Sequence, residues 1–237
     1  MESFEVRTAS ARPLTSFVRE IAFERVDERP FVFTAGQWVN IFLESDAGEV
    51  KRSYSVASAP DGSSRFAIAV TRVEGGAASG ALHDLPLGKV LRATGPSGFF
   101  VRPPDDPSSS LFVATGTGLC PIRSMVKAAL GVGSTAKLSI LLGVRHESDV
   151  LWADEMSAWS NDHPNLTVAV TLSQPGPGWT GLRGYVQDHV PNLWGALGDP
   201  AGHLYVCGLE RMVKAVREVA RGPLGIDRKR VHQEKYD

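Results

Sequence analysis

The sequence predicts two domains, an antiparallel β-barrel followed by an α/β domain built on a parallel sheet. Three observations predict this: the chain length, the short β-type runs in roughly the first hundred residues, and the apolar runs that alternate with helical patterns afterwards. With 237 residues the chain is long for one domain and short for three. Its composition, 43% hydrophobic and 22% charged, is typical of a globular protein and excludes wholesale disorder.

The first domain is predicted over residues 1–102 as an antiparallel Greek-key barrel, whose closure would protect the strand edges. Short runs rich in β-branched and aromatic residues predict the strands, and turn residues separate them. The predicted strands are Phe31–Phe33, Trp38–Leu43, Ser53–Val56, Phe66–Val73 and Val90–Ala93. The predicted turns are Ala35–Gly36, Asp46–Gly48, Pro60–Gly62, Gly75–Gly76 and Gly95–Pro96. A short helix is expected at Ala81–Asp84.

Residues 103–110 are predicted to be a linker, because the prolines and serines of Arg102–Ser110 exclude a helix and a central strand. The second domain is predicted over residues 111–237. Its apolar runs indicate parallel strands covered by helices. The predicted strands are Leu111–Thr115, Leu138–Val144, Leu166–Leu172 and Leu204–Cys207. Near the end, the apolar stripe from Met212 to Ala220 predicts a helix packed on the core.

The charge and the cysteines exclude several classes of partner. A formal net charge of −1 provides no overall field for nucleic acid or an anionic membrane, so we expect neither partner. No apolar run is long enough for a membrane span and no leader is evident, so we expect a cytoplasmic protein. Cys120 and Cys207 are too few for a disulfide framework or a structural zinc site, and no metal is expected.

One glycine-rich segment, Gly116–Pro121, follows an apolar strand and predicts an anion site. Glycine lets the backbone approach an oxyanion, and the free N–H groups of the helix that starts near Pro121 favour negative charge. The third glycine of the usual dinucleotide fingerprint is absent. A plain tight turn is therefore the alternative.

Two segments of the first domain could also bind a ligand. On a strand, Arg52 and Tyr54 would project to one face and Ser53 and Ser55 to the other. The arginine could hold a phosphate while the tyrosine ring lies against a planar group. The small residues Gly76–Ser79 could form a second anion cradle, with Ser79 as a helix cap. The alternatives are a surface arginine beside a half-buried tyrosine, and an ordinary capped turn.

Together these segments resemble, in order and spacing, the ferredoxin–NAD(P) reductase family, in a form without an iron-sulfur domain. The resemblance covers nearly the whole chain. Its motifs are RxYS at Arg52, Tyr54 and Ser55; GxxS at Gly76–Ser79; GPxG at Gly95–Gly98; GTGxxP at Gly116–Pro121; and the CG pair Cys207–Gly208, followed by Met212. The ending Glu234–Tyr236 resembles that of plant-type members, although here Asp237 follows the aromatic residue.

The resemblance implies a barrel that binds FAD rather than FMN and an α/β domain that binds NADPH or NADH. It implies hydride transfer from nicotinamide C4 to flavin N5 across roughly 3 to 3.5 Å in a crevice between the two domains. The implied catalytic residues are Ser55, Cys207 and Glu234. The implied FAD-binding residues are Arg52, Ser53, Tyr54, Ser55, Ala69, Val70, Thr71, Gly76, Ala77, Ala78, Ser79, Thr117 and Tyr236. The implied nucleotide-binding residues are Gly116, Thr117, Gly118, Pro121, Arg145, Ser173, Arg183, Cys207, Gly208, Leu209 and Met212.

Two arginines favour NADPH slightly over NADH. Arg145 and Arg183 match positions where NADP-dependent members carry arginines, and a 2′-phosphate prefers arginine forks. Gln174 after Ser173 departs from that pattern. Surface pairing of Arg145 with a nearby carboxylate is the alternative interpretation.

The electron acceptor is expected to be a separate protein, because the chain has no Cys-rich ferredoxin module and no haem motif. We expect a monomer that reduces a small acidic ferredoxin or flavodoxin, with a cytochrome P450 or another oxygenase downstream. Candidates for a basic docking cluster are Arg7, Arg12, Arg72 and Arg92. The alternatives are a reductase of free flavin or quinone, and a non-catalytic flavin-binding electron-transfer or sensor subunit.

Overall fold

The computed structural model describes residues 2–45 and 48–236 and divides into two compact units. The first unit runs to Pro104 and also includes Arg123–Gly131. The second comprises Asp105–Ile122 and the chain from Val132 onwards. Among the described residues, no helix is both long and apolar enough to cross a membrane.

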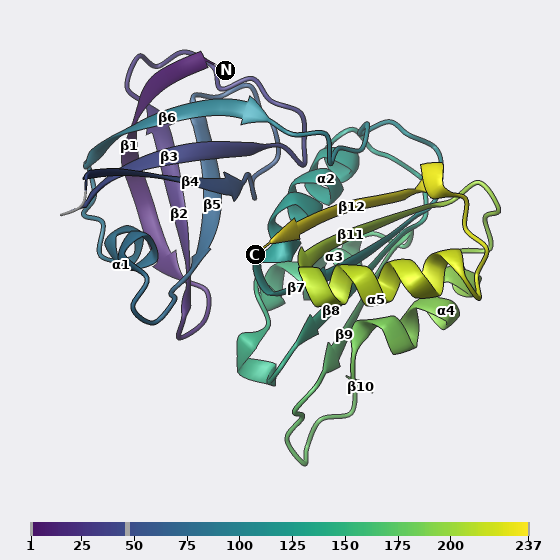
Figure 1. Cartoon of the computed structure of the whole chain (residues 1–237). Coiled ribbons are helices and arrows are strands. Elements are labelled where there is room, and N and C mark those ends of the chain that lie inside the picture. Colours follow the sequence, from purple (N-terminus) through teal and green to yellow (C-terminus); the bar gives the residue numbers. More distant parts are fainter. Residues whose placement is uncertain (1, 46–47, 237) are drawn as a thin grey trace. The chain divides into compact units, whose positions relative to one another are not determined.

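The first unit is a six-stranded antiparallel sheet (Figure 1). Its elements are β1 (Glu2–Pro13), β2 (Val18–Arg25), β3 (Trp38–Ser45), β4 (Gly48–Ser55), β5 (Arg65–Thr71), α1 (Ala77–His83) and β6 (Val90–Ser97). The strand order β4-β3-β6-β1-β2-β5 inserts the last strand between the third and the first. The predicted antiparallel barrel is therefore confirmed as a fold, but β4 and β5 are edge strands and the barrel is open between them.

Several local predictions for this unit are wrong. The segment Phe31–Phe33 is a loop and forms no strand. Phe31 and Phe33 are buried in the core, whereas Val32 is 77% exposed. The dipeptide Gly95–Pro96 lies inside β6, joined by a cis bond, and is not a turn. The short helix starts at Ala77, four residues before the predicted start. Of the predicted turn at 46–48, residues 46 and 47 lie outside the described residues.

The sequence also missed the two N-terminal strands. Charged residues occupy their outer face, where Arg7 on β1 stands opposite Glu24 on β2 and Arg12 stands opposite Glu20. Because of these charged residues, the alternating apolar residues of the inner face are hard to recognise in the sequence. Such opposite-charge pairs stabilise an antiparallel ladder by about 0.2 to 1 kcal/mol each.

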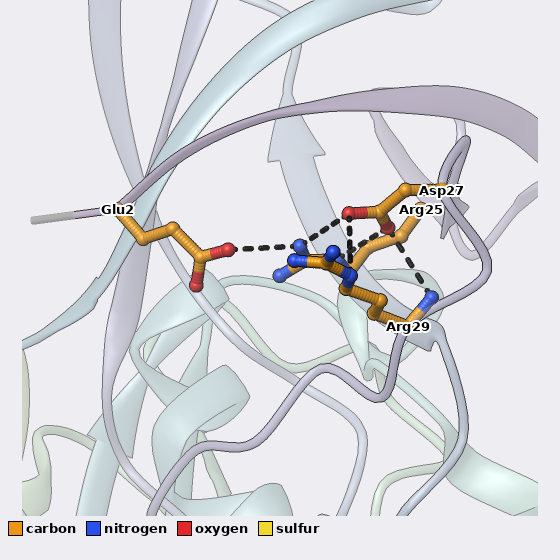
Figure 2. A network of polar contacts seen from close by, with 4 residues as sticks. All are labelled: Glu2, Arg25, Asp27 and Arg29. Atoms are coloured by element: carbon orange, nitrogen blue, oxygen red, sulfur yellow. Dashed lines mark hydrogen bonds and ion pairs between the residues drawn. The ribbon is translucent and has the colours of Figure 1, made fainter.

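A buried arginine fixes the beginning of the chain to the barrel (Figure 2). The Arg25 side chain is 4% exposed and lies over the ring of Phe4, 4.5 Å from its centroid. It donates hydrogen bonds to Glu2 (2.9 Å) and Asp27 (2.7 Å), and Asp27 also accepts the backbone N–H of Arg29 (3.2 Å). The hydrogen bond from Arg25 lowers the pKa of Asp27 to about 2. The network therefore ties β1 to the end of β2.

The second unit is a six-stranded parallel sheet with helices, as predicted. Its strands are β7 (Ser110–Thr115), β8 (Leu138–Val144), β9 (Leu166–Leu172), β10 (Leu182–Arg183), β11 (His203–Leu209) and β12 (Val231–Tyr236). Its helices are α2 (Leu119–Gly131), α3 (Ala153–Asp162), α4 (Val186–Leu197) and α5 (Glu210–Arg221). Three 3₁₀ turns are η1 (Gly116–Gly118), η2 (Glu147–Asp149) and η3 (Arg228–Arg230). The strand order is β10-β9-β8-β7-β11-β12.

Helix α2 contributes to both units, although the sequence assigns it to the second domain. Arg123 donates to the carbonyl of Ala57 (2.8 Å) and contacts Glu20 at 3.6 Å. Ser124 donates to the carbonyl of Ser58 (2.6 Å). These bonds explain why residues 123–131 group with the barrel.

The C-terminal segment forms an edge strand that the sequence did not predict. β12 pairs in parallel with β11, and His232 stands opposite Tyr205 in the register. Their rings stack with centroids 4.4 Å apart, and His232 Nε2 lies 2.8 Å from Nδ1 of His203. Burial, together with the neighbouring His203, lowers the pKa of His232 below its usual value.

Candidate functional site

Strand β4 presents the Arg-Ser-Tyr-Ser segment of the barrel. Tyr54 is half-buried against the barrel core, and this burial raises the pKa of its phenol to about 12. Arg52 is exposed, and Ser55 is buried. Ser53 donates to Oδ1 of Asn40 on β3 (2.8 Å), which holds it against the neighbouring strand. The strand thus offers a neutral aromatic ring beside an exposed arginine.

An open hollow of about 490 Å³ lies at the start of α1. Its lining residues are Phe17, Arg72, Val73, Glu74, Gly75, Gly76, Ala77 and Gly80. A Cβ on Gly76 would lie 2.8 Å from Oγ of Ser79, so this position has no room for a side chain. Because the first N–H groups of a helix lack intrahelical acceptors, the hollow combines backbone donors with small side chains.

The structure corrects the predicted role of Ser79. Gly76, not Ser79, precedes α1, and no side chain caps the helix. Ser79 lies within the helix, where its hydroxyl accepts the N–H of Val73 (3.0 Å) and donates to the carbonyl of Gly76 (3.0 Å). The serine therefore fixes the turn that lines the hollow.

The other end of α1 is held by residues that the sequence did not single out as functional. His83 is buried, and its Nε2–H donates to the carbonyl of Val70 on β5 (2.8 Å). Arg19 on β2 donates to the carbonyl of His83. The predicted neighbours Ala69 and Val70 are buried, and Thr71 is half-buried. The sequence shows no pattern that links His83 with Val70, because the two residues come into contact only when the chain is folded.

In the second unit, the glycine-rich turn lies against the end of β11. A Cβ on Gly118 would lie 2.2 Å from the carbonyl oxygen of Cys207. Gly208 has φ +146°, and a Cβ there would lie 2.3 Å from Oγ1 of Thr115. That hydroxyl is buried and has no hydrogen-bond partner among the described residues. Gly116, Thr117 and Gly118 form η1, and Pro121 lies in the first turn of α2. Glycine is thus required both in η1, at Gly118, and near the end of β11, at Gly208.

Cys207, Glu234 and Tyr236 gather on β11 and β12. Cys207 is fully buried and stands opposite Glu234, while Leu209 stands opposite Tyr236. Burial and then the Glu234 carboxylate raise the pKa of the Cys207 thiol, and a hydrogen bond with Tyr236 opposes them. The thiol is therefore neutral and not activated as a nucleophile. Met212 is buried next to Gly208.

The remaining predicted residues of the second unit lie at the carboxyl ends of β8, β9 and β10, which are neighbours in the sheet. Ser173 donates its N–H to the carbonyl of Val144 (3.0 Å), next to Arg145. Arg145 is exposed and makes no ion pair with another described residue. Arg183 is exposed and donates to the carbonyl of Trp179 (2.6 Å). Among the described residues Arg145 pairs with neither Glu147 nor Asp149, the two carboxylates considered for it, and Asp149 contacts His146 instead (3.2 Å).

The predicted residues thus fall into two groups, one in each unit. The first group, on β4, β5 and α1, contains the residues expected to bind the flavin, apart from Thr117 and Tyr236, which belong to the second unit. The second group lines the carboxyl edge of the parallel sheet, which is where ligands bind in open α/β sheets. Each group pairs glycine-lined backbone with an exposed arginine.

Two family descriptions match the chain. "Oxidoreductase FAD-binding domain" matches residues 17–101, and "Oxidoreductase NAD-binding domain" matches residues 112–218. The chain is 56% identical over 240 residues to ferredoxin–NADP reductase B of Sorangium cellulosum, covering 100% of this chain and 98% of that protein. It is 34% identical over 197 residues to the reductase component of phenol 2-monooxygenase from a Pseudomonas species, covering 79% of this chain and about half (53%) of that protein.

Two solved structures share the fold. The Amycolatopsis cytochrome P450 reductase matches with a TM-score of 0.87 at 24% identity, over 99% of this chain and 69% of that one. A ferredoxin–NADP⁺ reductase from Neisseria gonorrhoeae with bound FAD and NADP matches with a TM-score of 0.82 at 17% identity, over 99% of each chain. Both confirm the predicted fold class.

Proposed function

Because the chain belongs to the ferredoxin–NADP reductase family, we propose that it takes hydride from NADPH onto FAD and passes electrons to a separate ferredoxin or flavodoxin. The observation that carries this proposal is the full-length likeness to a reductase of that kind. The relatives that serve a monooxygenase or a cytochrome P450 support an oxygenase as the enzyme downstream.

The barrel fits FAD at the hollow by α1. Gly75, Gly76 and Ala77 line it without bulky side chains, so a pyrophosphate could approach the backbone N–H groups of the first turn. Arg52 would pair with the phosphates, and the neutral Tyr54 ring would lie against the isoalloxazine. Buried Ser55 would donate a hydrogen bond at the ring edge. Bound FAD would supply the capacity to accept a hydride and release electrons singly.

The carboxyl edge of the parallel sheet fits NADPH. Gly116 and Gly118 would let the nucleotide pyrophosphate reach backbone N–H groups. The neutral thiol of Cys207 would pack beside the nicotinamide and position it, and Glu234, opposite in the register, would hold the carboxamide end. Thr115 Oγ1, buried and without a hydrogen-bond partner in the described part of the chain, is a polar group that a ligand here could satisfy.

Two exposed arginines support NADPH over NADH. Arg145 follows β8 and Arg183 ends β10, the two strands that flank β9, and neither arginine is neutralised by a carboxylate among the described residues. A 2′-phosphate would give both guanidinium groups a bidentate partner. Ser173 directly follows β9, the strand between theirs, and could donate its hydroxyl to the same phosphate.

The test is spectroscopic. Purified protein should be yellow, release FAD on denaturation, and lose flavin absorbance when NADPH is added without oxygen. Cytochrome c reduction should then require added ferredoxin, whereas a reductase of free flavin or quinone would reduce those acceptors directly and gain nothing from ferredoxin. A colourless protein that fails to bind FAD would refute the proposal. We also propose that the reductase is a cytoplasmic monomer, which sedimentation and cell fractionation test.

A further inference from the structure

We propose that Trp179 is a positioning residue that holds the Arg183 guanidinium in place for the 2′-phosphate of NADPH. The inference rests on the proposed function, because it names a residue that acts through Arg183 on the choice of nucleotide. No motif named above contains Trp179. The contacts of its indole ring, of its backbone and of Arg183 carry the proposal.

The loop between β9 and β10 has a composition that gives it little regular structure of its own. Residues 175–178 read Pro-Gly-Pro-Gly, and Gly181 follows shortly after. Glycine loses more conformational freedom on folding than any other residue, and proline donates no backbone hydrogen bond. Figure 1 shows this loop extending beyond the ends of both strands. Trp179 is its only aromatic residue, and therefore the side chain best suited to fix its shape.

The Trp179 indole folds back over this loop. Its Nε1–H donates to the carbonyl of Leu182 (2.8 Å), and the backbone N–H of Trp179 donates to the carbonyl of Gly176 (3.2 Å). The ring fills the space beside Gly181, where an added Cβ would lie 2.7 Å from Cε2 of the indole. We call the contact of Trp179 with Gly181 and Leu182 the tryptophan clasp. The clasp fixes the loop on both sides of residue 179, and with it the direction of the Trp179 carbonyl.

That carbonyl holds one edge of the Arg183 guanidinium. Nη2 of Arg183 donates to the carbonyl oxygen of Trp179 (2.6 Å). A guanidinium has five N–H donors, and the remaining donors of Arg183 have no partner in the part of the chain that the structure describes. An exposed arginine otherwise samples many rotamers, so a side chain held at one edge loses less freedom when a phosphate binds. The clasp therefore presents donors that a phosphate can engage in pairs.

The backbone of Arg183 is fixed by other contacts. Arg183 stands opposite Leu172 of β9 in the register, and its carbonyl oxygen lies 2.9 Å from Nε2 of His189 on α4. The hydroxyl of Thr171 donates to the next carbonyl, that of Gly184 (3.0 Å). Loss of the clasp should therefore free the guanidinium without moving the strand that carries it. This separates a positioning role of Trp179 from a general role in folding.

The clasp lies far from the place where hydride would leave the nucleotide. Cys207, beside which the nicotinamide would pack, is on β11, and β11 is the fourth strand from β10 in the sheet. At ~4.8 Å per strand this separation is about 19 Å. NADH has a hydroxyl where NADPH has the 2′-phosphate, and so it gives the guanidinium no anion to bind. The clasp should therefore affect the binding of NADPH and leave hydride transfer unchanged.

The test uses two variants of the full chain with FAD bound, which break the clasp in different ways. Trp179→Phe removes the indole N–H, and Gly181→Ala pushes the ring away from the turn. The control is Gly178→Ala in the same loop, where a Cβ meets open space. Arg183→Ala, alone and combined with Trp179→Phe, completes a double-mutant cycle.

Two measurements separate nucleotide binding from turnover. Calorimetry measures the binding of adenosine 2′,5′-bisphosphate, a probe that carries the 2′-phosphate but has no hydride to transfer. Steady-state ferricyanide reduction gives KM and kcat with NADPH and with NADH. We expect both clasp variants to bind the bisphosphate about two- to tenfold more weakly and to raise the KM for NADPH by the same factor, because binding must then immobilise the arginine side chain. The kcat with NADPH and the KM for NADH should keep their original values.

The double-mutant cycle decides whether Trp179 acts through Arg183. In the Arg183→Ala background, Trp179→Phe should have no further effect on bisphosphate binding. The proposal would be overturned by an equal rise of both KM values, by an effect of Trp179→Phe that persists without Arg183, or by equal weakening in Gly178→Ala. Unchanged bisphosphate affinity in the clasp variants, or no bisphosphate binding by the original protein, would also overturn it. Absence of ferricyanide reduction with either nucleotide would instead contradict the proposed function, because calorimetry tests the clasp without hydride transfer.

Discussion

The sharpest test of how the barrel holds its cofactor is the replacement His83→Leu. The His83 ring is buried and its Nε2–H donates to the carbonyl of Val70 (2.8 Å), which joins the end of α1 to β5. Leucine fills a similar volume but has no donor. Because α1 begins at the hollow beside Gly76, loosening its far end should also disturb the proposed pyrophosphate site.

The structure sets the expected size of this effect. Depriving the buried Val70 carbonyl of its donor costs about 1 to 3 kcal/mol. In a chain of this length each kcal/mol lowers the melting temperature by roughly 2 to 4 °C, so we expect a loss of about 2 to 12 °C. If half of that cost falls on the bound state alone, FAD affinity drops about two- to tenfold, since 1.4 kcal/mol is a factor of ten.

The assay is differential scanning fluorimetry of the apoprotein, together with a titration that follows quenching of FAD fluorescence. His83→Gln is the matched variant, because its side-chain amide retains a donor near the position of Nε2 and should restore most of both quantities. An unchanged melting temperature in His83→Leu would refute the stabilising hydrogen bond. A lowered melting temperature with unchanged FAD affinity would refute the link between this bond and the cofactor site.

Three further predictions concern the second unit. Replacing Arg145 and Arg183 with alanine should raise the KM for NADPH about tenfold or more and leave that for NADH unchanged, as steady-state ferricyanide reduction would show. Gly118→Ala should abolish tight NADPH binding but not FAD binding. The new Cβ would lie 2.2 Å from the Cys207 carbonyl oxygen, and such overpacking costs about 1 to 3 kcal/mol. Anaerobic titration measures the binding of NADPH and of FAD. Burial and the neighbouring His203 lower the pKa of His232 below 6.5. The unfolded chain therefore binds more protons than the folded chain, and stability falls as the pH drops from about 6.5 towards the folded pKa. His232→Asn should flatten this pH dependence of the melting temperature.

Each of these three predictions has an outcome that would contradict it. Equal effects on both nucleotides would remove the two arginines from the 2′-phosphate site. Gly131→Ala, at the end of α2 where a Cβ meets open space, should leave NADPH binding intact. A pH slope retained in His232→Asn would assign this slope to other groups.

The sequence predicted the architecture because its strongest signals are local. Apolar runs such as Leu138–Val144, buried on both faces, need only their own composition to be recognised as parallel strands. β1 and β2 were not predicted, because their outward residues form ion pairs with partners 8 to 17 positions away in the chain and a local sequence pattern cannot show that pairing. The segment Phe31–Phe33 was wrongly predicted as a strand. Its alternating aromatic residues anchor a loop in the core without forming the hydrogen bonds of a sheet.

The site shows the same division between local and distant contacts. Gly118 and Gly208 were recognisable as motif members, but the reason both must be glycine is their contact with each other's strand ends, 90 positions apart in the chain. His83 carried no signal, because its partner Val70 is defined only by the fold. Arginine is the instructive case. Composition counts every guanidinium alike, yet only the structure separates Arg12, neutralised by Glu20, from Arg183, which faces no carboxylate among the described residues. A phosphate site is set by the second kind of cation, because a charge already paired within the chain has little field left to attract an anion.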